Sequence, residues 1–397
     1  MLKNNSIESI IREQPVNVPF AFNIELKPSL PATTQNRTGR CWLFSGLTML
    51  RYLSKTDDEF SYAYLFYHDK VQRYRQTLMT LAELPPDMRT HRYVIYHEAM
   101  SDGGQWDLFA SLVKRFGLVP RSAMPETYHS SSSKGMNRLA NRMLRVHESR
   151  LMAVKDMDER CKLVDALTEE AAHVFADLLG TPPTTVEIDD TPTEPTAFFK
   201  KMNLDLDAFV SIVHDPRRQE DAPPQWYELE CVFDCNGQRV GWLAVSMARL
   251  EALALKALQN GEAVWFGANV EDLDRDNAVH DPSLGDFTKV WPWMGMSKRE
   301  KLETFHAVPS HAMVMTGVHV HANTKLPVRW KIDNSWGQGG PNKGKHVMTA
   351  AGFREFVFQV VIRRSFLTSD ETAAVAMRNT ENATLVPPDD PLATLAR

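Results

Sequence analysis

The stretch QNRTGRCWLFSGLTMLRYLS, residues 35–54, decides how the rest of the chain is interpreted. From Cys41 to Ser54 it carries leucines and a phenylalanine at helical spacing and no proline, which predicts a mostly buried helix. The part before Cys41 is polar and contains Gly39, which suits a tight loop that brings backbone close to a ligand. Cys41 is therefore expected at the first turn of a helix, where unpaired N–H groups and the helix dipole favour a thiolate.

A cysteine alone is commonly an inert buried residue, so its partners decide whether it is a nucleophile. A cysteine nucleophile needs a base and a group that orients the base. His311 precedes an apolar run and is expected at a strand start, where it is the candidate base, and Asn334 is the candidate orienting group. Trp336 is expected to shield their hydrogen bond from water. Gln35, in the polar loop, offers an amide donor for a developing oxyanion.

Each of these residues also has a purely structural interpretation. His311 on its own is compatible with a hydrogen-bonded core histidine, and Asn334 with a turn residue before a glycine loop. The order Gln, Cys, His, Asn, with the sequence NSWG at the last position, is what favours catalysis.

Composition narrows the class of protein. The chain has 397 residues, enough for about two to three domains. Its formal charge of −5 argues against nucleic acid as the main ligand, and its four cysteines exclude a disulfide-built scaffold. The first twenty residues hold no apolar core of a secretory signal, and no apolar run is long enough to span a bilayer. We therefore expect a soluble protein of the cytoplasm, without contact to a membrane.

The pattern of the chain changes from helical to strand-rich at its middle. After the first helix, helical periodicity covers 61–80, 105–117 and 134–180, and a Pro/Thr-rich segment, 181–196, is expected to be a loop or linker. Short strands are expected at 226–233, 262–270, 311–320, 327–336 and 356–366. Helices followed by strands indicate an α+β protein with two lobes. The last residues, LVPPDDPLATLAR, look like an extended tail.

Five segments carry a resemblance to a known family: QNRTGRCWLFS (35–45), DGGQW (102–106), GEAVWFG (261–267), SHAM (310–313) and DNSWG (333–337). In these segments the chain resembles the papain-like cysteine peptidases, and within them the bleomycin hydrolase and aminopeptidase C family. The resemblance implies a papain-like two-lobe α+β fold, with a helical lobe, a β-barrel-like lobe, a large helical insertion and a C-terminal arm. The divisions it implies are an N-terminal arm (1–34), a helical catalytic lobe (35–125), a mainly helical insertion ending in the Pro/Thr-rich linker (126–225), a strand-rich catalytic lobe (226–380) and the C-terminal arm (381–397).

The resemblance also assigns roles to residues. It makes Cys41 the nucleophile, His311 the general acid and base, Asn334 its orienting partner and Gln35 the oxyanion donor. Gly103 and Gly104 look like the family's glycine pair, whose backbone binds an extended substrate. The separation between Cys41 and His311 is 311 − 41 = 270 residues, against about 130–150 in secreted papain-type enzymes. The extra length is what the resemblance assigns to the helical insertion.

The C-terminal arm resembles that of the family, in which the arm lies in the active-site cleft and its terminal carboxylate meets the α-amino group of the substrate. A fixed carboxylate favours a protonated N-terminus through a charge-assisted hydrogen bond, and the enzyme is then an aminopeptidase. Ala396 and Arg397 are the predicted substrate-binding residues. The basic Arg397 weakens that preference unless it points away or is trimmed to leave Ala396 terminal. A disordered tail is the alternative.

The predicted function is therefore that of a cytosolic cysteine aminopeptidase that acts on peptides, with bleomycin-type amide hydrolysis as a further activity. The resemblance implies no cofactor and no metal, and assembly as a homohexamer. Cys231 and Cys235 lie close together, but they have no second ligand pair nearby and are interpreted as structural thiols. Two alternatives remain open: a papain-like endopeptidase or amidase, and a non-enzymatic oligomer that binds nucleic acid. The basic run 137–150 supports the last only weakly, because a solvated helix face explains it as well.

Overall fold

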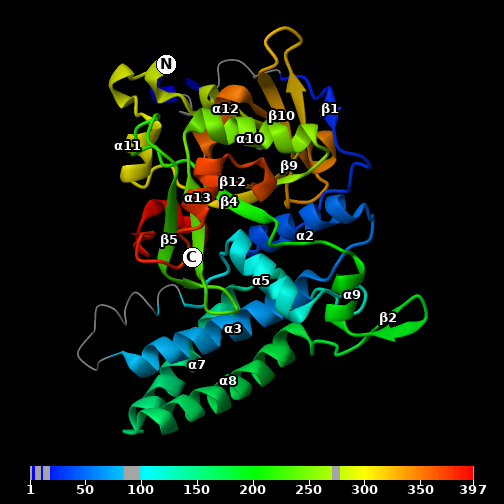
Figure 1. The fold of residues 1–397 in the computed structure, drawn as a ribbon, viewed down its shortest axis with the longest axis vertical. Coiled ribbons are helices and arrows are strands. Elements are labelled where there is room, and N and C mark those ends of the chain that lie inside the picture. The colour runs from blue at the N-terminus through cyan, green and yellow to red at the C-terminus, as the bar shows by residue number, and fades with distance from the viewer. Residues whose placement is uncertain are drawn as a thin grey trace.

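The computed structural model describes residues 2–4, 10–11, 18–84, 96, 99–270 and 278–396. Figure 1 shows helices gathered at one end of the molecule and a large sheet at the other, with α2 and α5 between them. The longer helices are α2 (Cys41–Ser54), α3 (Tyr62–Glu83), α5 (Trp106–Phe116), α7 (Lys134–Met152), α8 (Met157–Leu179) and α10 (Met247–Gln259). The shorter ones are α6 (Tyr128–Ser131), α9 (Pro195–Lys201), α11 (Lys298–Glu303), α12 (Ala350–Phe356) and α13 (Ser369–Val375). The α+β class is as predicted.

The large sheet has eleven strands, and its path runs β13-β5-β6-β4-β12-β7-β9-β10-β11-β8, with β1 paired to β9. Its strands are β1 (Ile24–Glu25), β4 (Phe209–Val213), β5 (Gln225–Phe233), β6 (Arg239–Ala244), β7 (Val264–Ala268), β8 (Val279–His280), β9 (His311–Val320), β10 (Pro327–Asp333), β11 (Lys345–Thr349), β12 (Val357–Arg363) and β13 (Thr384–Val386). The central pairs, β7 with β9 and β9 with β10, are antiparallel. All five residues of β7 are buried, as are nine of the ten residues of β9, so this part of the sheet is core.

The structure confirms the predicted helix from Cys41 to Ser54, and every residue from Cys41 to Tyr52 is buried. A helix buried all round must be held by groups that also satisfy its polar atoms. Nε1 of Trp265, on β7, donates to the carbonyl of Trp42 at 3.2 Å. The fully buried Arg40, just before the helix, forms a bidentate pair with Glu126 at 3.1 and 2.6 Å. These contacts fix the start of α2 between the helices and the sheet.

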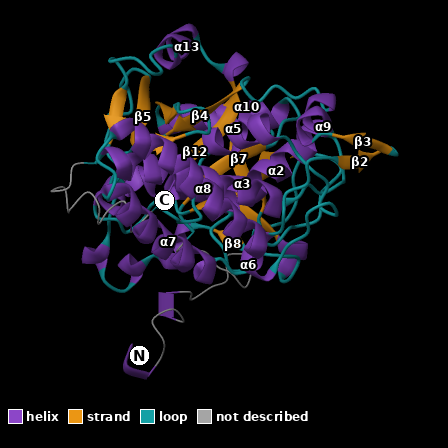
Figure 2. Cartoon of the chain, turned by 90° about the horizontal axis from the view of Figure 1, so that it is seen from below, coloured by secondary structure: helices purple, strands orange, loops and turns teal. Residues whose placement is uncertain are grey.

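The predicted helix over 134–180 is two helices rather than one. α7 ends at Met152, and α8 starts at Met157, where the side chain of Asp156 accepts from the backbone N–H of Glu159. Apolar residues recur at helical spacing in both helices, so this spacing does not show where one helix ends and the next begins. The N-cap at Asp156 marks the start of the second helix. In Figure 2, α7 and α8 lie at the front with the sheet behind them.

The segment predicted as a Pro/Thr-rich loop forms a small hairpin of β2 (Val186–Ile188) and β3 (Thr191–Thr193), which projects from the molecule in Figure 2. Asp189 and Asp190 both have positive φ, 51° and 56°, as a two-residue hairpin turn requires. β4 lies inside the segment 126–225 that was predicted to be mainly helical. It pairs with β12 and β6 because its five residues, FVSIV, form a short run that is buried on both faces.

The tail is not a uniformly extended segment. Residues Thr384–Val386 form β13, which pairs in parallel with β5, and Pro391–Ala396 form the 3-10 helix η7. The end of the described chain, in η7, lies between the helices and the sheet (Figure 1). Among the described residues, no helix is both long and apolar enough to cross a membrane.

Candidate active site

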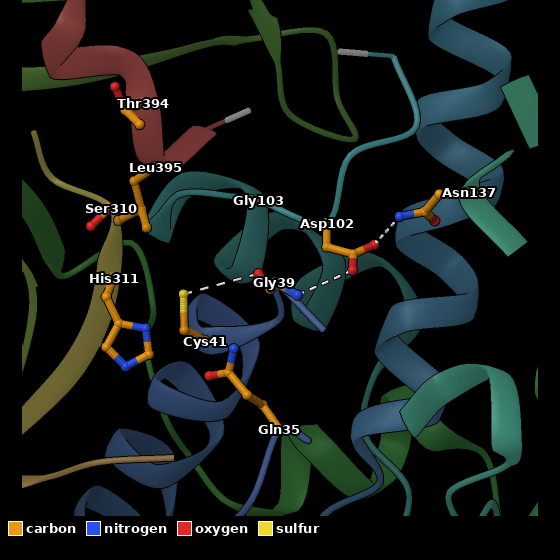
Figure 3. A pocket seen from close by; sticks show the side chains of 10 residues that line it. All are labelled: Gln35, Gly39, Cys41, Asp102, Gly103, Asn137, Ser310, His311, Thr394 and Leu395. Atoms are coloured by element: carbon orange, nitrogen blue, oxygen red, sulfur yellow. Dashed lines mark hydrogen bonds between the residues drawn. The ribbon is translucent and has the colours of Figure 1, made fainter. Parts of the chain in front are cut away.

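A cavity of about 310 Å³ lies where α2 meets β9 and the end of the chain. Its lining residues come from segments far apart in the sequence: Gln35, Gly39, Cys41, Asp102, Gly103, Asn137, Ser310, His311, Thr394 and Leu395. Figure 3 shows the imidazole of His311 and the amide of Gln35 on the two sides of Cys41. The fold therefore brings the predicted nucleophile, base and oxyanion donor to one cavity.

Cys41 is the first residue of α2, and its side chain is buried at the cavity floor. Arg40, the residue before it, makes no side-chain capping hydrogen bond, so the first N–H groups of the helix are not taken by a cap. Burial nevertheless raises the pKa of the Cys41 thiol to about 11. The backbone hydrogen bonds at the helix start lower the pKa of this thiol, as expected there, but desolvation outweighs them. A thiolate here needs a cation beside it, and His311 is the titratable base on the facing wall.

His311 is hydrogen-bonded to Asn334, the residue predicted to orient it. Nε2 of His311 and Oδ1 of Asn334 are 2.8 Å apart, and both residues are buried. His311 starts β9 opposite Ala268 of β7, while Asn334 directly follows β10, so the pairing of three strands sets their separation. Nε2 is bonded to Asn334, and in Figure 3 the other ring nitrogen lies on the side of Cys41.

Trp336 lies against this pair. The centroid of its ring is 5.0 Å from that of His311, at an interplanar angle of 33°. Trp336 is 37% exposed, whereas His311 and Asn334 are buried. The ring contact is compatible with the predicted shielding of the His311–Asn334 bond, which stays a prediction.

Two further histidines, which the sequence analysis missed, form a chain of contacts with the side-chain nitrogen of Asn334. Nδ2 of Asn334 lies 3.4 Å from Nε2 of His346, and Nδ1 of His346 lies 3.1 Å from Nε2 of His280. Because an amide nitrogen can only donate, His346 accepts at Nε2 and carries its proton on Nδ1. Burial lowers the pKa of His346 to about 4 and that of His280 well below its usual range, so both are neutral near pH 7. In the sequence His280 and His346 look like ordinary strand residues. Only the pairing of β8 with β11 brings them together.

Gln35 is held by the loop that carries Asn334. Its backbone N–H donates to the carbonyl of Ser335 at 2.9 Å, and its Oε1 accepts from the hydroxyl of Ser335 at 2.6 Å. Nε2 donates one proton to the carbonyl of Thr38 at 2.5 Å. An amide nitrogen has a second proton, and in Figure 3 the amide end of Gln35 lies next to Cys41. The geometry therefore leaves a donor for an oxyanion formed near the sulfur.

The two predicted substrate-binding glycines have different surroundings. Gly103 lines the cavity, and its carbonyl accepts from Arg73. Gly104 is not among the lining residues, and a Cβ added to it would come within 2.3 Å of the ring of Trp42. Gly103 is thus available to an extended substrate, whereas Gly104 permits close packing against α2.

Asp102, also missed in the sequence, organises this wall. Its carboxylate accepts from Lys70 and Asn137 at 2.8 Å each, from the backbone N–H of Gly39 at 3.1 Å, and from Ser133. Burial raises its pKa, but the charge of Lys70 and these hydrogen bonds outweigh that effect and hold the pKa well below its usual range. Asp102 therefore ties the nucleophile loop to the glycine pair.

The C-terminal arm reaches the cavity. Thr394 and Leu395 belong to its lining, and Ala396 is buried. Leu395 packs over β7, where a Cβ on Gly267 would lie 3.2 Å from it. The predicted contribution of Arg397 lies outside the described residues. Within the described part of the chain, no group of three His, Cys, Asp or Glu side chains could hold a metal ion.

Comparisons with known proteins agree with this geometry. The model of the Peptidase C1-like family matches residues 2–393. The chain is 30% identical to aminopeptidase C of Streptococcus thermophilus, over 99% of this chain and 93% of the relative, and 30% identical to bleomycin hydrolase of Gallus gallus, over 92% and 86%. The crystal structure of PepW from Lactobacillus rhamnosis superposes with a TM-score of 0.86 at 30% identity, covering 98% of this chain and 90% of that one.

Proposed function

Because the chain belongs to the Peptidase C1-like family, we propose that it is a cysteine aminopeptidase whose nucleophile is Cys41. Its fold is the papain-like α+β fold, and its homologues carry the names aminopeptidase C, aminopeptidase G and bleomycin hydrolase. One observation carries the proposal: Cys41, His311 and the arm residue Leu395 line the same cavity. A thiol, an imidazole and the end of the arm around one cavity are what the proposed reaction requires.

The proposed reaction is acyl transfer through a thioester. His311 takes the proton of Cys41, and the sulfur attacks the carbonyl carbon of the first peptide bond. The oxyanion of the tetrahedral intermediate accepts hydrogen bonds from the second N–H of the Gln35 amide and from the backbone N–H groups at the start of α2. The intermediate collapses, the C–N bond breaks, and the imidazolium of His311 protonates the leaving amine. His311 then deprotonates a water molecule, which attacks the thioester and releases the N-terminal residue.

The C-terminal arm accounts for removal of single residues. Thr394 and Leu395 of η7 line the cavity, and in the proposed mode of binding η7 leaves little room for substrate on the N-terminal side of the scissile bond. The carboxylate at the end of the arm is the partner we assign to the α-ammonium group of the substrate. Location in the cytoplasm, assembly as a homohexamer and any binding of nucleic acid stay predictions of the sequence.

The test compares the protein with its Cys41→Ala variant on an aminoacyl fluorogenic amide and on the N-acetylated form of the same amide. We expect cleavage of the free-amine substrate only, and loss of that cleavage in the variant. Equal cleavage of both substrates by the unmodified protein would instead support the endopeptidase alternative. A bleomycin-type amide belongs in the same assay, because the Gallus gallus relative is named for that hydrolysis.

A further inference from the structure

The C-terminal arm is attached to the body of the protein at a point well before its last residue. Strand β13 pairs with β5, with Thr384 opposite Tyr227 and Val386 opposite Leu229. Four residues beyond β13, Asp390 directly precedes the terminal 3-10 helix, where its Oδ1 accepts from the N–H of Leu392 at 2.9 Å. Asp390 therefore stands between the anchored strand and the part of the arm that lines the cavity.

Arg217 binds Asp390 with both ends of its guanidinium group. Nη1 is 2.8 Å from Oδ2 of Asp390, and Nη2 is 3.3 Å from Oδ1. The other side of the same guanidinium binds Asp215, with Nε at 2.8 Å from Oδ1 and Nη2 at 3.0 Å from Oδ2. Tyr227 of β5 also donates to Asp215, at 3.3 Å. Arg217 is thus a cation fixed between one carboxylate of the body and one carboxylate of the arm.

Burial makes this pair stronger than an ordinary surface pair. The side chains of Arg217, Asp215 and Asp390 are 27%, 5% and 12% exposed. A bidentate arginine–carboxylate pair with little solvent around it fixes the orientation of both groups. It also contributes more to stability than an exposed ion pair does. Without the cation, Asp215 and Asp390 would face each other as like charges, which repel.

A change at Asp390 can affect the cavity because the part of the arm beyond it is short and mostly buried. Leu392, Ala393, Leu395 and Ala396 are buried, and Thr394 and Leu395 line the cavity. The N–H of Ala393 donates to the carbonyl of Asp390 at 2.9 Å, so a shift of Asp390 moves the first turn of η7 with it. The position of Asp390 therefore sets how far the end of the chain extends towards Cys41.

We propose that Arg217 is a positioning residue for substrate specificity, which clasps Asp390 and so holds the end of the arm at the blocked end of the cavity. This inference rests on the proposed function, because it names what keeps the arm in place. When the clasp opens, the arm leaves the cavity and longer or N-blocked peptides gain entry. Arg217 does not touch the reacting atoms and acts only through the arm.

The test uses the full-length protein with Asp390→Asn, which removes the charge but keeps the acceptor for the N–H of Leu392. The matched control is Asp389→Asn, the same change at the exposed neighbouring position. Asp390→Glu keeps the charge, and Arg217→Gln removes the cation that Asp215 and Asp390 share. Two quantities are measured: hydrogen exchange of the peptide containing residues 391–396, and the ratio of kcat/KM for a free-amine substrate to that for its N-acetylated form.

In Asp390→Asn we expect exchange in the arm to rise, and the ratio to fall, by about tenfold each. Asp389→Asn should have the arm exchange and the kcat/KM ratio of the unmodified protein. Asp390→Glu should keep most of the preference for the free-amine substrate. In Arg217→Gln the kcat/KM ratio should fall at least as far as in Asp390→Asn. Because the pair is partly exposed, higher salt should raise arm exchange in the unmodified protein more than in Asp390→Asn.

Unchanged arm exchange in both Asp390→Asn and Arg217→Gln would overturn the clasp, whatever the substrate preference. If arm exchange rises in these variants but the unmodified protein cleaves both substrates equally, the clasp stands and the aminopeptidase proposal fails. The two proposals therefore fail in different ways.

Discussion

Nε2 of His311 and Oδ1 of Asn334 are 2.8 Å apart, although 23 positions separate them in the sequence and they lie at the ends of two paired strands. The bond fixes the ring so that the other nitrogen faces the cavity with Cys41. Behind Asn334, the neutral pair His346 and His280 determines which end of the amide points at His311.

Replacing Asn334 by alanine should lower kcat by about a hundredfold, because His311 then loses its fixed orientation and the partner that stabilises its charged form. KM should change far less, since Asn334 does not line the cavity. Steady-state kinetics on a free-amine substrate measure both, with the exposed Asn323→Ala as the control. An unchanged kcat would contradict the assigned role.

The reactivity of Cys41 should depend on His311. Burial raises the pKa of the isolated thiol to about 11, so without a neighbouring imidazolium only about one molecule in ten thousand carries a thiolate at pH 7. In His311→Ala, the rate of alkylation by iodoacetamide should keep rising with pH up to about 11. The protein with His311 should already react rapidly near neutrality, and identical pH profiles would refute the pairing.

Stability should fall in acid because of His346. Its pKa is lowered from 6.5 to about 4 by burial, so the unfolded chain binds more protons than the folded one in that interval. The stabilising contribution of the neutral ring is complete above about pH 6.5 and is lost as the pH falls through 4. In His346→Gln the free energy of unfolding, measured by urea titration, should depend less on pH between 6.5 and 4. The exposed His306→Gln serves as control and should keep the original slope.

Much of this arrangement follows from local sequence. The helix that carries Cys41 has a continuous apolar pattern, and the order of glutamine, cysteine, histidine and asparagine indicates a cysteine nucleophile with its base. The fold class and the family are confirmed, whereas the catalytic roles stay predictions with a supporting geometry. The helix could be predicted because it depends on one short stretch of chain, whereas the family was recognised from five short segments distributed along the chain.

The rest depends on contacts between distant segments. The break between α7 and α8 comes from the cap at Asp156, and strands β4 and β13 exist only through pairing with strands far along the chain. The support of Asn334 by His346 and the clasp of Asp390 by Arg217 join residues that no sequence spacing relates. Such partners become visible only when the sheet is assembled.

The start of α2 should depend on one buried charge pair. Arg40 is fully buried and its guanidinium is bonded to Glu126, so Glu126→Gln leaves a buried cation without its counter-charge. We expect a loss of about 3 kcal/mol in the free energy of unfolding, measured by urea titration. The exposed pair of Arg299 and Glu303 offers the matched control, and Glu303→Gln should cost less than about 0.5 kcal/mol. Equal effects of the two changes would contradict the anchoring role of Arg40.

The most direct test of the central claim labels the protein with an aminoacyl chloromethyl ketone that has a free amine, and with its N-acetylated counterpart. A nucleophilic sulfur displaces chloride and keeps the label as a thioether, which peptide mapping by mass spectrometry locates. We predict one equivalent of the free-amine label on Cys41, none on Cys161 or Cys235, and little reaction with the acetylated reagent. Label on another residue, or equal labelling of Cys41 by both reagents, would contradict a cysteine aminopeptidase whose cleft is closed by its own C-terminal arm.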